Sequence, residues 1–187
     1  ALHIARSFQQ PAVSVIKHNN PCGAAVAENL GDATRKAMAG DPLSAFGSVL
    51  GFNRSVDAGA AEILSEPGLF IEAIVAPGFE EKALEILTTI PKWKKNGRLM
   101  LVGELGDQQA RLQPRHIDGG MLLQVADDLP DEPGQWDIVT SAQPDETELS
   151  ELEFAWQIVR HIKSNAIAIC REQSLVGAGA GQMSRVD

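Results

Sequence analysis

The sequence AVSVIKHNNPCG, at residues 12–23, joins an apolar run to a group of turn-forming residues. Residues 12–16 are apolar and rich in β-branched side chains, which predicts a short buried strand. Asn, Pro and Gly follow at residues 19–23, and these residue types are typical of turns. We therefore expect a strand that ends near Lys17 and His18, with a turn directly behind it.

Strand-like and helix-like patterns alternate on both sides of this stretch. Further strands are predicted at residues 48–52, 69–75, 98–102, 121–125 and 136–140, with a hairpin formed by residues 166–170 and 174–178. Helices are predicted at residues 32–39, after an Asp57 cap, from Glu80 onward, and after an Asp145 cap with Glu148 three residues on. Leu149, Leu152, Trp156, Val159 and Ile162 line one face of the last helix. This alternation predicts a layered α/β/α fold with a mainly parallel sheet.

The pattern weakens between residues 104 and 143, where the chain is polar, acidic and contains proline. We expect a subdomain boundary in this region and divide the chain into residues 1–120 and residues 121–187.

Composition excludes several classes of protein. Among 187 residues, 16 are Lys or Arg and 25 are Asp or Glu, a net charge of -9, whereas general nucleic-acid binders are basic. Apolar runs fall short of the roughly 20 residues that cross a bilayer. The only cysteines, Cys22 and Cys170, are far apart, which excludes a disulfide scaffold and fits a reducing compartment. We expect a cytoplasmic protein without nucleic-acid or membrane partners.

Lys17 and His18 are the first candidate site residues, because ligand sites in open α/β sheets lie at the carboxyl ends of strands. Neighbouring residues of a regular strand point to opposite faces, so the two share a pocket only if the strand ends there. The positive charge of Lys17 would then favour the neutral imidazole of His18, which could act as a base. The alternative is a surface lysine beside a hydrogen-bonded histidine.

A zinc site at Cys22 is not expected. Zinc nucleobase deaminases carry H-x-E and P-C-x-x-C motifs, whereas here Asn20 replaces the Glu and Ala25 the second Cys. Tetrahedral catalytic zinc needs three protein ligands, which the sequence does not supply nearby. Cys22 is most simply a small buried residue.

Two segments near the end of the chain have both a functional and a structural interpretation. Residues 177–181 are glycine-rich but lack the third glycine of the dinucleotide motif, leaving an anion-binding turn or a plain turn. Asn165 follows the long helix, where Asn commonly ends a helix, but its amide could also orient a ligand.

Six motifs occur in order along the chain: IKHNNPCG at 16–23, DPLSAFG at 41–47, NRSVD at 53–57, IVAP at 74–77, KSNAI at 163–167 and GAGQMSRV at 179–186. Together they closely resemble the formyltransferase part of the AICAR transformylase/IMP cyclohydrolase family. The resemblance covers nearly the whole chain, and only residues 104–143 are weakly matched.

The resemblance implies a cytidine deaminase-like fold that is used without zinc, and a homodimer. It implies a transfer of the formyl group of 10-formyltetrahydrofolate to the 5-amino group of AICAR. It also implies that residues 1–120 are the first transformylase subdomain and residues 121–187 the start of the second. The cyclohydrolase domain that closes the ring to IMP is separate in the family.

The resemblance also implies roles for individual residues. His18 matches the family's base, Lys17 its partner, and Asn165 a catalytic, substrate-binding Asn. Gly47 and Glu72 match positions near AICAR. Leu43, Arg185 and Val186 match positions on the folate side.

Because an N-terminal Arg-Tyr-Gly motif and later nucleotide contacts of the family lie outside residues 1–187, we expect this chain alone to be inactive. The alternative to an enzyme segment is an inactive fragment, or a nucleotide-binding or dimerisation module of the same fold.

Overall fold

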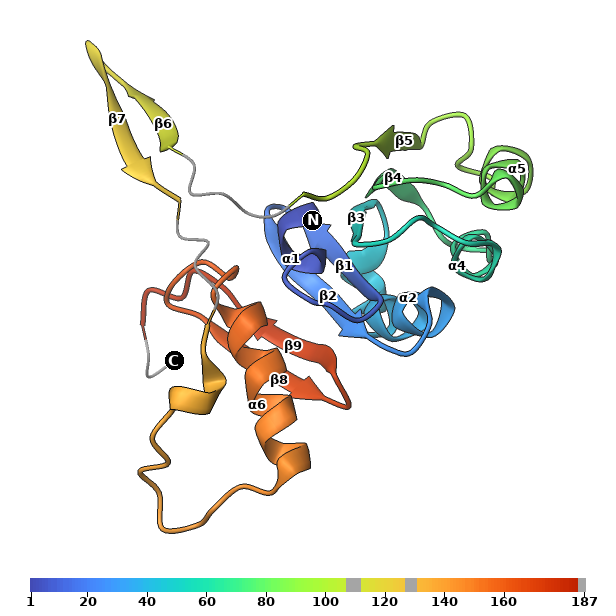
Figure 1. The fold of residues 1–187 in the computed structure, drawn as a ribbon. Helices are drawn as coiled ribbons and strands as arrows, with labels where there is room; N and C mark the ends of the chain where they lie inside the picture. Colours follow the sequence, from blue (N-terminus) through green and yellow to red (C-terminus); the bar gives the residue numbers. More distant parts are fainter. Residues whose placement is uncertain (107–111, 127–130, 185–187) are drawn as a thin grey trace. The chain divides into compact units, whose positions relative to one another are not determined.

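The computed structural model describes residues 1–106, 112–126 and 131–184 (Figure 1). Residues Ala1–Leu105 and Pro144–Asp187 form one compact unit, and Gly106–Gln143 form a second. The division expected at residue 120 falls within this second unit, and as a statement about family subdomains it stays a prediction. In the described part of the chain, every helix is too short or too polar to cross a membrane.

The first unit contains a seven-stranded sheet in the order β5-β4-β3-β1-β2-β9-β8. Its strands are β1 (Ala12–Lys17), β2 (Asn20–Val26), β3 (Ser48–Phe52), β4 (Ile71–Ala76), β5 (Arg98–Leu101), β8 (Ile167–Arg171) and β9 (Ser174–Gly179). β2, β3, β4, β5 and β8 run in one direction, and β1 and β9 run in the other. The expected mainly parallel sheet is confirmed, because most of the strands run in the same direction. Among these seven strands, the parallel pairs are β3-β4 and β4-β5.

Helices cover both faces of this sheet and form two separate cores (Figure 1). The helices of this unit are α1 (Leu2–Ala5), α2 (Leu30–Ala39), α3 (Pro42–Ala45), α4 (Ala58–Leu64), α5 (Glu81–Thr89) and α6 (Glu146–Val159). A 3-10 turn at Pro133–Gln135 belongs to the second unit. On one face α2, α4 and α5 pack over β1, β3 and β4 around Leu50, Phe52 and Ile74. On the other face α1 and α6 pack over β1, β2 and β9, with Phe154 and Ile158 buried. The layered α/β/α arrangement is therefore confirmed.

The strand β2 corrects the sequence-based prediction of a turn at residues 19–23. The turn is tighter and earlier, with His18 at φ 50° and Asn19 at φ 69°, and Asn20–Val26 pairs with β1 as an antiparallel hairpin. Left-handed residues at both positions match the twist of the flanking strands, and Asn tolerates this conformation. A register shift beside Ile16 brings Pro21 opposite that residue, so a proline without an N–H fits inside the ladder.

Two further expectations are wrong. Residues 136–140, all within the described part of the chain, do not form a strand. Of the residues expected on one face of the last helix, Ile162 is buried, but Leu152 and Trp156 are 53% and 51% exposed, and the buried residues of α6 are Phe154 and Ile158. The ring of Phe8 stacks on Phe154 at 5.2 Å, which turns this side of the helix toward the sheet.

The second unit contains a hairpin of β6 (Leu112–Ile117) and β7 (Gly120–Val125), which confirms the strand expected at residues 121–125. The pairing puts five apolar residues on one face of the hairpin: Leu112, Pro114, Met121, Leu123 and Val125. All five are exposed.

Close packing of α2 on β2 depends on Gly23. A Cβ atom at this position would overlap the carbonyl oxygen of Ala37 on α2. We predict that Gly23→Ala lowers the free energy of unfolding by about 1–3 kcal/mol, the usual cost of overpacking.

The matched control is Gly59→Ala in α4, where the nearest atom to an added Cβ is Asp57 Oδ1 at an ordinary 3.5 Å. This change should stabilise the helix by about 0.5–1 kcal/mol. Urea unfolding measures both variants. Equal midpoints for Gly23→Ala and the unchanged chain would show that the helix moves away at no cost.

Candidate functional site

Lys17 is the last residue of β1, and its ammonium group is held by the main chain of a distant segment. Lys17 Nζ donates hydrogen bonds to the carbonyl oxygens of Phe46 at 2.7 Å and Gly47 at 3.0 Å. A lysine ammonium has three donors, so one remains for another acceptor. The expectation that the strand ends at this residue is confirmed.

Gly47 has two structural reasons to be glycine. Its φ of 70° lies in the left-handed region, where other residue types are strained. An added Cβ would also lie 3.1 Å from Lys17 Nζ and 3.4 Å from the ring of Phe70. The N–H of Gly47 donates to the Phe70 carbonyl at 2.7 Å, which fixes this close approach.

His18 and Asn165 lie in two turns that are connected by hydrogen bonds. His18 is exposed in the β1–β2 turn, directly after Lys17. Asn20, on the other side of that turn, accepts a hydrogen bond at 3.5 Å from the N–H of Lys163, two residues before Asn165. Asn165 donates from its amide to the Gln182 carbonyl at 2.9 Å and accepts from the Gln182 N–H at 3.2 Å. The β1–β2 turn, the segment before β8 and the segment after β9 are thereby linked.

Lys17, Gly47, Glu72 and Asn165 all lie at the same end of the sheet. β1 and β9 end there, whereas β2, β3, β4 and β8 begin there. Lys17 lies at the carboxyl end of its strand, as expected, whereas β3 and β4 contribute their amino ends. The reason is that β1, which carries Lys17, is antiparallel to β3.

Of the remaining predicted site residues, those in the described part of the chain form no hydrogen bond or ion pair with Lys17. Glu72 on β4 pairs with Arg98 at 3.5 Å, and both side chains are largely exposed. Leu43 on α3 is 91% exposed. Arg185 and Val186 lie outside the described residues, so their predicted folate-side roles stay predictions.

The glycine-rich segment is more regular than expected. Gly177 and Gly179 belong to β9 and lie opposite Ile169 and Ile167 of β8, and the chain turns only after Gly179. The predicted hairpin across residues 171–173 is confirmed.

Sequence reasoning missed Asp41 as a structural residue of this region. Its carboxylate accepts a hydrogen bond from the N–H of Ser44 at 3.0 Å and so caps α3. Hydrogen bonds from Ser44 lower the pKa of this carboxyl group. The signal was present in the sequence, because Asp followed by Pro is typical of the start of a helix.

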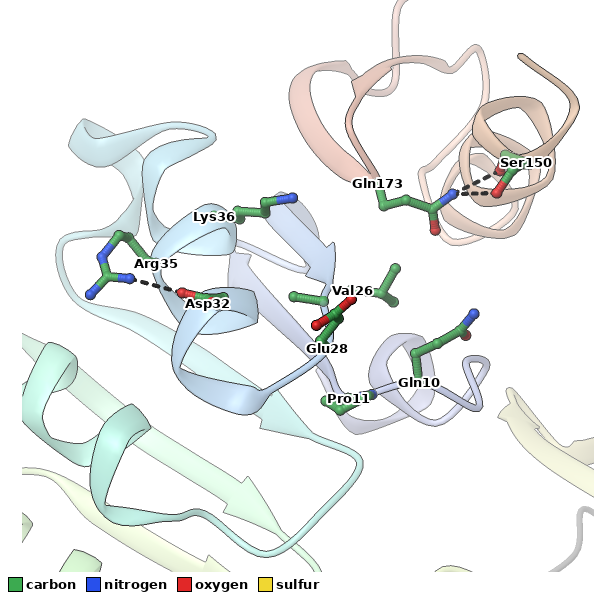
Figure 2. A pocket seen from close by; sticks show the side chains of 10 residues that line it. Gln10, Pro11, Val26, Glu28, Asp32, Arg35, Lys36, Ser150 and Gln173 are labelled. Carbon is green, nitrogen blue, oxygen red and sulfur yellow. Dashed lines mark hydrogen bonds and ion pairs between the residues drawn. The ribbon is translucent and has the colours of Figure 1, made fainter. Parts of the chain in front are cut away.

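A cavity of about 620 Å³ lies at the opposite end of the sheet, where β1 begins and β2 ends. Figure 2 shows residues that line it, among them Pro11, Val26 and Gln173. The two cationic residues of its lining are engaged within the protein: Arg35 pairs with Asp32 at 3.1 Å, and Lys36 donates to the Glu172 carbonyl at 3.0 Å. Among the described residues, none of the predicted site residues lines this cavity. We therefore place the candidate site at the Lys17 end of the sheet, where Lys17, His18 and Asn165 all lie.

The two thiols are held in their protonated form. Burial, with a smaller contribution from the negative charge of Asp41, raises the pKa of Cys22 to about 11. Burial and then the charge of Glu151 raise the pKa of Cys170 to about 11. Zinc binds the thiolate, so both environments disfavour a metal ligand. Within the described residues, His, Cys, Asp and Glu do not gather in groups of three or more that could hold a metal ion. The absence of zinc stays a prediction.

These pKa values predict slow alkylation of both cysteines. Since the thiolate is the reactive form, a pKa of about 11 leaves roughly one thiol in a thousand reactive at pH 8, about a hundredfold less than for an ordinary thiol. Labelling should accelerate as the pH rises toward 11. Iodoacetamide labelling followed by peptide mass spectrometry measures this, with an exposed Ser141→Cys as the internal control. Labelling of Cys22 as fast as that control at pH 8 would contradict the prediction.

Comparison with known proteins identifies the family. The family described as "AICARFT/IMPCHase bienzyme" matches residues 1–187. A "Bifunctional purine biosynthesis protein PurH" of Rhodopirellula baltica is 58% identical over 187 residues, covering 100% of this chain and 36% of the relative. Proteins of the same name from Oceanobacillus iheyensis and Acaryochloris marina are 41% and 42% identical, with 100% and 97% of this chain and 35% and 33% of each relative covered. The chain thus spans about a third of the length of these relatives. Because the family match extends over all of residues 1–187, the chain belongs to the AICARFT/IMPCHase bienzyme family.

Proposed function

We propose that the chain is the formyltransferase segment of a bifunctional purine-biosynthesis enzyme. It would transfer the formyl group of 10-formyltetrahydrofolate, as co-substrate, to the 5-amino group of AICAR. The family membership supports the reaction class. The observation that carries the proposal is the Lys17 ammonium group, fixed on two carbonyls at a strand end with His18 in the adjacent exposed turn.

The proposed reaction is an acyl transfer between two amines. The amine nitrogen of AICAR attacks the formyl carbon, and negative charge develops on the formyl oxygen. His18 takes the proton of the attacking amine and returns it to N10 of the folate as the bond between N10 and the formyl carbon breaks. The products are FAICAR and tetrahydrofolate.

Lys17 would stabilise the charge on the formyl oxygen. Two of its three donors are used by Phe46 and Gly47, and the third is available for that oxygen. Donors that are fixed before reaction stabilise developing charge most effectively, because they need no rearrangement in the transition state. Asn165 would hold AICAR, beside Gly47 and Glu72, while Leu43, Arg185 and Val186 would contact the folate.

The test uses a protein as long as the relatives, in which residues 1–187 occupy the segment that matches them. We call this protein the full-length carrier protein. In it, His18→Ala should lower kcat for formyl transfer by about a hundredfold or more, as for loss of a general base. The matched control is His3→Ala, an exposed histidine on α1, away from the hairpin. Formation of tetrahydrofolate with both substrates saturating measures turnover. A His18→Ala variant with turnover like that of the control would refute the assignment of the base.

The alternative is a fragment that binds nucleotide without turnover. This alternative rests on the observation that the chain spans about a third of the length of its relatives. We propose that residues 1–187 alone show little transfer activity, since catalysis depends on holding two anionic substrates together. The isolated chain is assayed beside the full-length carrier protein.

We also propose that the protein forms a homodimer through the β6–β7 hairpin. An isolated two-stranded hairpin is at best marginally stable in water, and this one exposes an apolar face. Such a face is typically covered by a partner, and we assign that role to a second copy of the protein.

Leu123→Arg, on the apolar face, should therefore convert dimers of the full-length carrier protein to monomers, because a charge would be buried without a partner. Gln124→Arg, on the opposite face of the same strand, is the matched control. Sedimentation or light scattering measures the mass. Dimers that persist in Leu123→Arg would exclude the hairpin as the dimer contact.

A further inference from the structure

The two carbonyls that hold Lys17 follow directly after a very short helix. The helix α3 has only four residues, Pro42–Ala45, and the Phe46 and Gly47 carbonyls come next. One turn of helix has little stability of its own, because nucleation costs more than a single hydrogen bond returns. The position of the carbonyls therefore depends on what fixes each end of this segment.

One end is fixed by Asp41 and the other by Phe70. Asp41 accepts from the Ser44 N–H through its side chain and from the Ala45 N–H at 2.9 Å through its carbonyl. At the other end, Gly47 donates to the Phe70 carbonyl at 2.7 Å, and the rings of Phe46 and Phe70 contact each other with centroids 5.5 Å apart. The carbonyls that bind Lys17 lie between these two attachments.

We infer that Asp41 is a positioning residue for Lys17: by capping α3 it holds the Phe46 and Gly47 carbonyls at the place that fixes the Lys17 ammonium group. This inference rests on the proposed function for the role of Lys17 in formyl transfer. Asp41 acts through the backbone and not by pairing with Lys17, whose hydrogen bonds go to the two carbonyls.

Substitutions of Asp41 that keep or remove the helix cap distinguish an effect through the backbone from an effect of the Asp41 charge. Asn caps a helix as well as Asp does, whereas Ala does not. Asp41→Asn should therefore preserve the position of Lys17 although it removes the charge, and Asp41→Ala should release it. Asp57→Ala is the matched control, because Asp57 caps α4 in the same way, accepting from the Ala60 N–H at 2.8 Å.

The first measurement does not depend on activity. In the full-length carrier protein, acylation of Lys17 by an amine-directed reagent at pH 8 is followed by peptide mass spectrometry. Asp41→Ala should accelerate labelling of Lys17 about fivefold, the factor that corresponds to loss of a typical cap. Asp41→Asn and Asp57→Ala should stay within about twofold of the unchanged protein. Equal rates in Asp41→Ala and the unchanged protein would overturn the inference.

The second measurement is a double-mutant cycle on kcat. Asp41→Ala alone should lower kcat by about fivefold to tenfold, but in a Lys17→Ala background it should lower kcat by less than about twofold. Fully multiplicative losses would mean that Asp41 acts independently of Lys17, and the inference would be wrong. A loss in Asp41→Asn as large as in Asp41→Ala would also overturn it, in favour of charge.

The two measurements distinguish failure of the inference from failure of the proposed function. A full-length carrier protein that transfers no formyl group, but whose Lys17 labelling responds to Asp41→Ala, would refute the function and leave the positioning role intact. Normal transfer with unresponsive labelling would refute the positioning role alone.

Discussion

The tight turn at His18 and Asn19 is the constraint on which the rest of the sheet depends. It sends the chain back along β1, so that β1 is flanked by antiparallel partners on both sides, β2 and β3. With β1 reversed, its carboxyl end meets the amino ends of β3 and β4. Lys17 can then reach the segment before β3, which a parallel arrangement of β1 and β3 would place at the far end of the strand.

Much of the fold could be predicted because the deciding signals are local. The caps at Asp57 and Asp145, and the capping box with Glu148, depend on residues within one turn of each other. The strand at β1 and the β8–β9 hairpin were likewise confirmed. β2 was missed because Pro21 and Gly23 are typical of turns. Only the register shift beside Pro21 and the contact of Gly23 with α2 explain these residues in a strand.

The failures involve tertiary contacts. Which side of α6 is buried depends on Phe8, far away in the sequence. At the site, Lys17 and His18 could be picked out from the sequence, but the partners of Lys17 are main-chain carbonyls about thirty residues away. Backbone acceptors leave no residue-type signal, so this arrangement could be recognised only in the structure.

The pairing of β2 with β9 has a consequence for the order in which the chain assembles during synthesis. Ala25 pairs with Ser174, and the hairpin unit Gly106–Gln143 lies between them in the sequence. At translation rates of roughly 5–20 residues per second, β2 waits on the order of ten seconds for its neighbour. Until then the core built by α2, α4 and α5 can form, while the opposite face of the sheet stays without α6. The growing chain therefore carries an unpaired strand edge on the ribosome, which is the point at which pairing with another nascent chain competes with folding.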